Sequence, residues 1–109
     1  MMLGMIGEAL KGHLDLLLLA VLESGPSHGY AIIETLRQRS KGTFDLPEGT
    51  IYPALHRLEE DGLLKSEWSE NSGRRKRIYQ LTPKGERFLA KKQSEWREFA
   101  RAVNATVNG

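Results

Sequence analysis

Hydrophobic residues recur at helical spacing in the first part of the chain and predict two successive helices. The first is expected over about residues 8–23 and largely buried, since its apolar positions are Leu10, Leu14, Leu17, Leu18, Val21 and Leu22. A Ser24-Gly25-Pro26 break ends it. Ser27 is then expected to cap a second helix over about residues 28–40 by accepting a backbone N–H bond. Gly42 ends this helix, which faces inward with Ile32, Ile33 and Leu36.

A third helix is predicted after the Pro47-Glu48-Gly49 break, because Ile51, Leu55 and Leu58 form one apolar stripe at positions i, i+4 and i+7. Pro53 is expected within the first turn, where its missing amide donor has no intrahelical partner to lose. The helix should therefore begin near residues 48–50, and Gly62 ends it.

The rest of the chain predicts a hairpin and a long helix. Residues 63–69 and 77–82 are short segments rich in Leu, Ile, Trp and Tyr, which is typical of strands. Turn-forming residues followed by bases lie between them, in the run Glu70-Asn71-Ser72-Gly73-Arg74-Arg75. Thr82 is expected as the N-cap, and Pro83 as the first residue, of a last helix that runs to about residue 107.

Three helices, a basic hairpin and a long helix are the order of a winged helix-turn-helix. The predicted class is α+β and mostly helical, with a two-stranded basic wing and a long C-terminal helix. Residues 8–82 would form the winged helix DNA-binding domain and residues 83–109 a C-terminal dimerisation helix, together one compact unit. A length of 109 residues and a mass of 12.3 kDa agree with one domain.

Composition removes several classes of protein. The chain has no cysteine, which excludes a disulfide scaffold and zinc sites built on sulfur. Its longest uncharged apolar run has seven residues, from Leu16 to Leu22, where a membrane span needs about 20. The first residues lack the basic start and small-residue cleavage site of a signal peptide. We therefore expect a cytoplasmic protein without a membrane partner.

The net charge of +2 hides an uneven distribution. Residues 1–69 carry 6 basic and 10 acidic side chains, residues 70–92 carry 8 and 2, and residues 93–109 carry 2 and 2. Basic charge is thus concentrated in one short stretch, which favours contact with a polyanion. A solvated charge run without a partner is the alternative interpretation.

The third helix is the candidate reader of the major groove. With its apolar stripe buried, a rotation of 100° per residue places Gly49, Pro53, His56 and Arg57 on the opposite side, with Thr50 and Tyr52 on the flanks. Of these residues, Thr50, Tyr52, His56 and Arg57 have side chains that can donate to phosphates or base edges. Three alternatives stay open: Tyr52 packs beside the hairpin, His56 is a plain surface residue, and Arg57 pairs with Glu60 or Asp61.

The wing carries four successive cations, Arg74 to Arg77, after a Ser72-Gly73 turn. Strand alternation predicts that Arg74 and Lys76 face one way and that Arg75 and Arg77 face the other. Two or three of them could then touch a phosphate backbone or a minor groove together, and they would add affinity more than specificity.

Three segments of the chain carry a more specific pattern: His28-Gly29-Tyr30, the run from Pro47 to Leu63 containing Gly-Thr-Ile-Tyr-Pro-Ala-Leu, and the run from Gly73 to Gly85. Together they resemble the PadR family of bacterial transcriptional regulators. A winged-helix pattern alone would also fit the MarR or ArsR type. The resemblance, to the short type with a single C-terminal helix, implies a homodimeric repressor that binds a palindromic operator and is released by a small molecule or another signal. It places DNA contacts on Tyr30, Thr50, Tyr52, His56, Arg74, Arg75 and Lys76.

The last helix has an apolar stripe that a body of some 80 residues cannot cover along a length of about 37 Å. The stripe predicts a dimer contact, with Phe88, Trp96, Phe99 and Val103 as interface residues. Alternatively, Trp96 folds back onto its own domain. Trp96 is also the candidate for binding a planar aromatic effector, and structural packing is the competing interpretation.

Catalytic constellations are missing from the sequence. His13, His28 and His56 are far apart, with no His-Glu-x-x-His motif, no cysteine and no phosphate-binding loop. We predict no enzyme, no metal and no cofactor. The function predicted is sequence-specific regulation of transcription on double-stranded DNA; the alternative is a winged-helix module for protein association without specific DNA binding.

Overall fold

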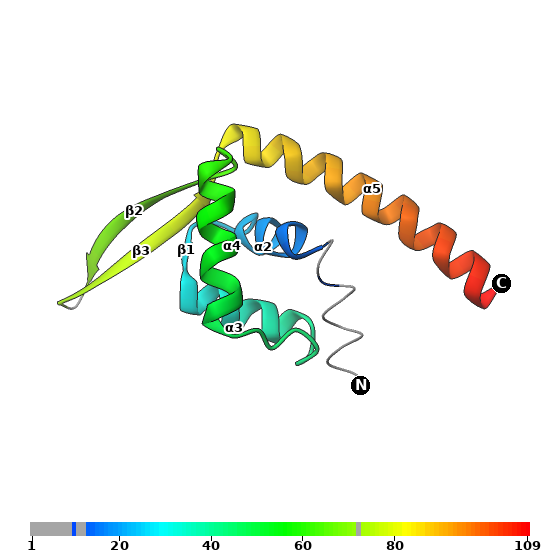
Figure 1. The fold of residues 1–109 in the computed structure, drawn as a ribbon, viewed down its shortest axis with the longest axis horizontal. Helices are drawn as coiled ribbons and strands as arrows, with labels where there is room; N and C mark the ends of the chain where they lie inside the picture. The colour runs from blue at the N-terminus through cyan, green and yellow to red at the C-terminus, as the bar shows by residue number, and fades with distance from the viewer. Residues whose placement is uncertain (1–9, 11–12, 72) are drawn as a thin grey trace.

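A computed structural model describes residue 10, residues 13–71 and residues 73–109. In chain order the elements are α2 (Leu14–Leu22), β1 (Ser27–His28), α3 (Gly29–Arg39), α4 (Glu48–Glu60), β2 (Leu64–Asn71), β3 (Arg74–Leu81) and α5 (Pro83–Asn108) (Figure 1). The predicted winged helix-turn-helix with a long C-terminal helix is confirmed. Residues 8, 9, 11 and 12 of the first predicted helix lie outside the described residues.

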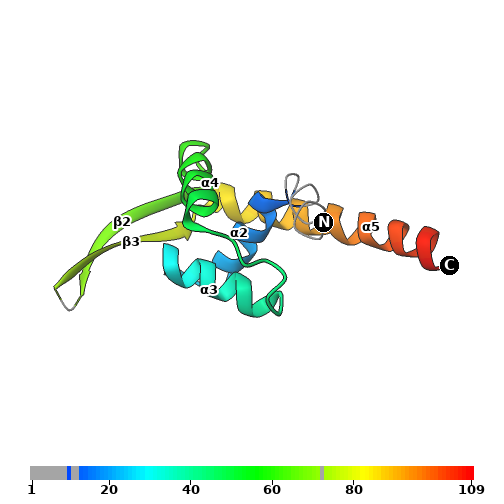
Figure 2. The ribbon, with the colours of Figure 1, turned by 60° about the horizontal axis from the view of Figure 1, so that its bottom comes forward.

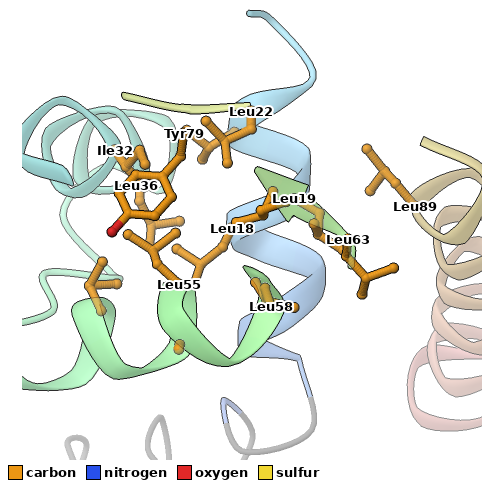
Figure 3. Close-up of a cluster of buried hydrophobic side chains, with 14 residues drawn as sticks. Leu18, Leu19, Leu22, Ile32, Leu36, Leu55, Leu58, Leu63, Tyr79 and Leu89 are labelled. Atoms are coloured by element: carbon orange, nitrogen blue, oxygen red, sulfur yellow. The ribbon is translucent and has the colours of Figure 1, made fainter. Parts of the chain in front are cut away.

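The hydrophobic core lies where α2, α3 and α4 meet the base of the sheet. Helix α4 contributes Ile51, Leu55 and Leu58, all with no exposed surface, and they pack with Leu18 and Leu19 of α2 (Figure 3). Ile32 and Leu36 of α3, Tyr79 of β3 and Leu89 of α5 complete this cluster. Burial of each large aliphatic side chain contributes about 1.5 to 3 kcal/mol, so the apolar stripe of α4 fixes how that helix is rotated.

The sheet has three antiparallel strands in the order β1-β3-β2. Strand β1, which the sequence pattern did not predict, pairs Ser27 with Tyr79 and His28 with Ile78. Because Ser27 belongs to this ladder, the N-cap of α3 is His28, whose Nδ1 accepts from the Ala31 amide at 3.3 Å. The predicted Ser27 cap is wrong by one residue. The short strand ties the start of α3 to the base of the wing.

The wing strands are longer than predicted. They pair from Leu64 with Leu81 out to Asn71 with Arg74, so the bases at 74 to 76 belong to β3 and not to the turn. Local propensity is weak over these charged residues, but the ladder of the neighbouring strand continues through them. Gly73 has a φ of 77°, a left-handed value that suits a tight hairpin turn.

Helix α4 begins at Glu48, as predicted, but Pro53 is its sixth residue and lies in the second turn. The predicted first-turn position of Pro53 is therefore wrong. A proline has no backbone N–H, so the carbonyl of Gly49, four residues earlier, loses its helical donor.

Helix α5 begins as predicted. The Thr82 Oγ1 accepts from the Gly85 amide at 2.9 Å and donates to the Gly62 carbonyl at 2.6 Å, and Pro83 is the first helical residue. Only Gly85 and Leu89 of the helix are buried. Its C-terminal half projects from the body at the end opposite the wing, which helps to give the molecule a longest dimension of 54 Å (Figures 1 and 2).

Gly85→Ala is expected to lower the free energy of unfolding by about 1 to 3 kcal/mol. A Cβ at Gly85 would collide with the backbone carbonyl oxygen of Leu63. Gly49→Ala is the matched control, since Gly49 also lies in the first turn of a helix and a Cβ there meets nothing within 4 Å. Urea unfolding measures both; equal stability of the two variants would contradict the close approach of α5 to Leu63.

Candidate nucleic-acid interface

The outward face of α4 is free, as its hydrophobic pattern predicts. Ile51 and Leu55 are fully buried, whereas Gly49, Pro53 and His56 are exposed on the opposite side. Thr50 and Tyr52 lie on the flanks and are partly buried. The His56 side chain is on the surface, and its Nε2 lies 3.7 Å from Oε1 of Glu60, one helical turn away. This face offers small and polar groups to a partner.

Arg57 turns away from this face and toward α2. Its Nη2 donates to Asp15 Oδ1 at 2.5 Å, and both side chains are about half exposed. The pairing of Arg57 with Glu60 or Asp61 that the sequence left open is therefore wrong. The partner lies 42 residues away in the chain, on a different helix, so spacing within α4 could not identify it.

Tyr30 and Tyr52 lie together near the start of α3. Tyr52 packs over Gly29, where a Cβ would collide with the tyrosine ring. Burial, followed by the negative charge of Glu48, raises the pKa of Tyr52. Tyr30 is 64% exposed, and a hydrogen bond with Glu48 is the main cause that raises its pKa. Both phenols are thus neutral at pH 7. The Tyr52 hydroxyl can donate a hydrogen bond to an acceptor such as a phosphate oxygen, and the Tyr30 hydroxyl can do so by leaving Glu48.

The wing presents exposed cations around an aromatic ring. Arg74, Arg75 and Lys76 are exposed. The guanidinium carbon of Arg75 lies 4.5 Å from the centroid of the Trp68 ring, and that of Arg77 lies 5.2 Å from it. Arg75 and Arg77 therefore share one face of the hairpin, which confirms that part of the predicted alternation. Trp68 was missed by sequence reasoning, although counting back along the hairpin would have placed it opposite Arg77.

A groove of about 480 Å³ lies between the two tyrosines and the wing. It is lined by the start of α3, by Tyr52 of α4 and by the wing, and its lining residues are His28, Gly29, Tyr30, Tyr52, Trp68, Arg74, Arg75, Lys76, Arg77 and Tyr79. Three of the predicted contact groups thus meet at one surface: Tyr30, Tyr52 and the bases of the wing. Thr50 and His56 do not line this groove and lie on the adjoining helix.

The apolar stripe of α5 is partly uncovered. Phe88 packs against the core of its own domain, so the exposed part begins further along, with Trp96, Phe99 and Val103. Trp96 contacts the His13 ring edge-on, with centroids 5.1 Å apart, and is still 42% exposed. A cavity of about 360 Å³ adjoins it, between α2 and α5, and is lined mainly by apolar side chains.

Within the described ranges, no helix has the length and apolarity to cross a membrane, and no three His, Asp or Glu side chains are grouped as metal ligands would be. The candidate functional site is therefore the exposed face of α4 together with the basic wing.

Comparison with known proteins assigns the family. The pattern of the Transcriptional regulator PadR-like family matches residues 18–91, which is more than half of the chain. The chain belongs to this family. The PadR-like protein is also similar to Transcriptional regulator Rv3488 of Mycobacterium tuberculosis, with 41% identity over 76 residues that cover 70% of this chain and 68% of the relative.

Solved structures of PadR-like proteins share the fold. A transcriptional regulator from Clostridium thermocellum has a TM-score of 0.83 and 31% identity, covering 92% of this chain and 98% of that one. A PadR family transcription regulator from Clostridium difficile has a TM-score of 0.76 and 39% identity, covering 89% and 99%. Because the family and these relatives are transcriptional regulators, the protein is a regulator of transcription and not an enzyme.

Proposed function

We propose that this PadR-like protein binds a palindromic operator as a homodimer, represses transcription there and is released by a small-molecule or other signal. The observation that supports it best is the orientation of α4. Its apolar side is buried in the core, and its opposite side, with Gly49, Pro53 and His56, is exposed beside a basic wing. A protein with this function acts on genomic DNA, so we place it in the cytoplasm.

In this proposal α4 enters the major groove and the wing lies on the neighbouring backbone or minor groove. Thr50 and His56 contact base edges, whereas Tyr30, Tyr52, Arg74, Arg75 and Lys76 contact the backbone. Arg57 reaches DNA only by giving up its ion pair with Asp15, an exposed pair of the kind that contributes less than about 1 kcal/mol. It would therefore serve as a secondary contact.

The uncovered stripe of α5 supports the homodimer. A second copy of the same helix, or of α2, would cover Trp96, Phe99 and Val103 by a two-fold contact. Two recognition helices held about 34 Å apart would then meet successive major grooves on one side of the duplex.

The cavity beside Trp96 supports an effector site. Its lining residues are apolar except for His13, Gln93 and Arg97. A planar aromatic compound could stack on the indole there, at the edge of the proposed dimer contact. Binding at this place would change how α2 and α5 pack, and so the spacing of the two recognition helices.

The competing function is a winged-helix module for protein association, and the half-buried position of Tyr52 over Gly29 is the observation that favours it. Such a module would bind duplex DNA weakly and without a preferred sequence.

Salt dependence separates the two functions. A dimer that neutralises roughly 8 phosphates should bind duplex DNA with a log–log salt slope near −7. Arg74→Ala should weaken binding to all sequences alike and reduce the slope by about 1 for each phosphate that is no longer neutralised. Fluorescence anisotropy over a series of salt concentrations measures this. If Arg74→Ala leaves the log–log salt slope unchanged, Arg74 does not contact the phosphate backbone.

If α4 reads bases, substitutions in it should weaken binding to the operator and not to all sequences alike. Thr50→Ala or His56→Ala should cost about 1 to 3 kcal/mol on an operator selected from genomic DNA and little on random duplex. Thr106→Ala is the control for Thr50→Ala, because Thr106 is an exposed helical threonine on α5. Equal losses on both kinds of duplex would show that Thr50 and His56 do not read bases.

The dimer contact predicts that Phe99→Glu yields a monomer, because the side chain is 56% exposed in one chain and would be buried in the pair. Sedimentation equilibrium gives the mass, and circular dichroism should show a retained helix content. Arg101→Glu, on the opposite side of α5, should leave the dimer intact. A monomeric wild-type protein at micromolar concentration would refute the homodimer.

A further inference from the structure

Trp68 lies in the centre of a continuous set of contacts on one face of the wing. It stands directly opposite Arg77 in the ladder, and Arg75 lies diagonally across, opposite Glu70. The two guanidinium groups lie 4.5 Å and 5.2 Å from the ring centroid. The ring is 54% exposed, so the hydrophobic core does not account for its position.

The two arginines differ in what else they touch. Arg77 Nε donates to Ser66 Oγ at 2.8 Å, and this hydroxyl donates to Glu59 Oε2 at 2.7 Å. The Arg77 Nη2 also lies 3.7 Å from the same carboxylate oxygen. Since Glu59 belongs to α4, these bonds connect the recognition helix to the wing. Arg77 is therefore held by an internal acid.

Arg75 makes no such bond. Glu70 stands opposite it in the ladder, but within the described residues Arg75 makes no ion pair, and its one strong partner is the face of Trp68. Stacking uses the flat face of a guanidinium and leaves the N–H donors at its edge free for a carboxylate or phosphate. An unrestrained arginine samples many rotamers, so contact with the ring reduces the ordering needed when an anion binds.

Trp68, Arg75 and Arg77 line the same groove as Tyr30 and Tyr52. A DNA strand that passes between the major groove occupied by α4 and the wing would run along this groove. The free donors of Arg75 and the two phenols are suited to its phosphates.

We propose that Trp68 is a positioning residue of the DNA interface: its ring holds Arg75 ready for a backbone phosphate, and Arg77 anchors that ring to the recognition helix through Ser66 and Glu59. This inference rests on the proposed binding of DNA by α4 and the wing. It assigns Arg75 to the phosphate and Arg77 to the scaffold, although the two bases are neighbours on one strand face.

A double-mutant cycle tests whether Trp68 acts through Arg75. Trp68→Ala is expected to weaken duplex binding about 3- to 10-fold, within the range of a cation–π contact, and Trp68→Tyr should restore most of the loss. In an Arg75→Ala background, Trp68→Ala should have almost no further effect. Lys76 is the matched control, since it is the neighbouring base on the same strand and is not one of the two cations over the Trp68 ring. Trp68→Ala and Lys76→Ala should therefore be additive.

Full additivity of Trp68→Ala with Arg75→Ala would overturn the inference, because the ring would then act on DNA by itself or not through Arg75. An Arg77→Ala variant whose salt slope falls by the value of a full phosphate contact would also contradict it, since Arg77 would then bind a phosphate.

A second measurement needs no DNA. The chain has two tryptophans, so protein labelled with 5-fluorotryptophan gives two fluorine resonances, and Trp68→Phe identifies the one from Trp68. Arg75→Ala and Glu59→Gln should shift the Trp68 resonance and leave that of Trp96 in place. An unmoved Trp68 resonance refutes the stack even if the protein binds DNA well. A shifted resonance in a protein that binds no duplex instead refutes the proposed function, and with it the role of Trp68 there.

Discussion

The burial of one side of α4 is the constraint on which the rest of the structure depends. Ile51, Leu55 and Leu58 are held in the core by α2, α3 and Tyr79, so the helix cannot rotate without exposing several large aliphatic groups. That single constraint determines which residues meet solvent on the other side. It also sets the direction in which the loop after Glu60 delivers the chain to the wing, and hence where the basic strand lies.

Polar contacts at the surface pair several of the charged side chains of α4. The acidic end of α4 would repel a phosphate backbone, but two of its carboxylates have partners: Glu59 with Ser66 and Arg77, and Glu60 beside His56. Arg57 is likewise engaged by Asp15. Near the core Glu59 is thus paired, whereas Arg74, Arg75 and Lys76 are exposed at the end of the wing, with Glu70 opposite Arg75.

Local rules were sufficient for the elements whose cause is local. The period of Ile51, Leu55 and Leu58 predicted the buried side of α4, and Thr82-Pro83 predicted the start of α5. Apart from the position of Pro53 within α4, the features that were missed needed a partner outside their own segment. Strand β1 has two residues, too few for a pattern, and exists because Tyr79 and Ile78 pair with it. The Arg57 ion pair depends on which helices the tertiary fold brings together, and no spacing within α4 encodes it. The Trp68 stack depends on the register of the hairpin, which was missed because the predicted strands ended too early.

The way α5 is attached to the body gives it the mechanics of a lever. Gly85 and Leu89 are its buried residues, and 26 residues at 1.5 Å per residue reach about 39 Å beyond the cap at Thr82. A tilt of about 5° at that base would move the far end by about 3 Å, which is close to one base-pair step of a duplex. In the proposed homodimer, the packing of the first turns of α5 against Leu63 would therefore set the distance between the two recognition helices to within about one base pair.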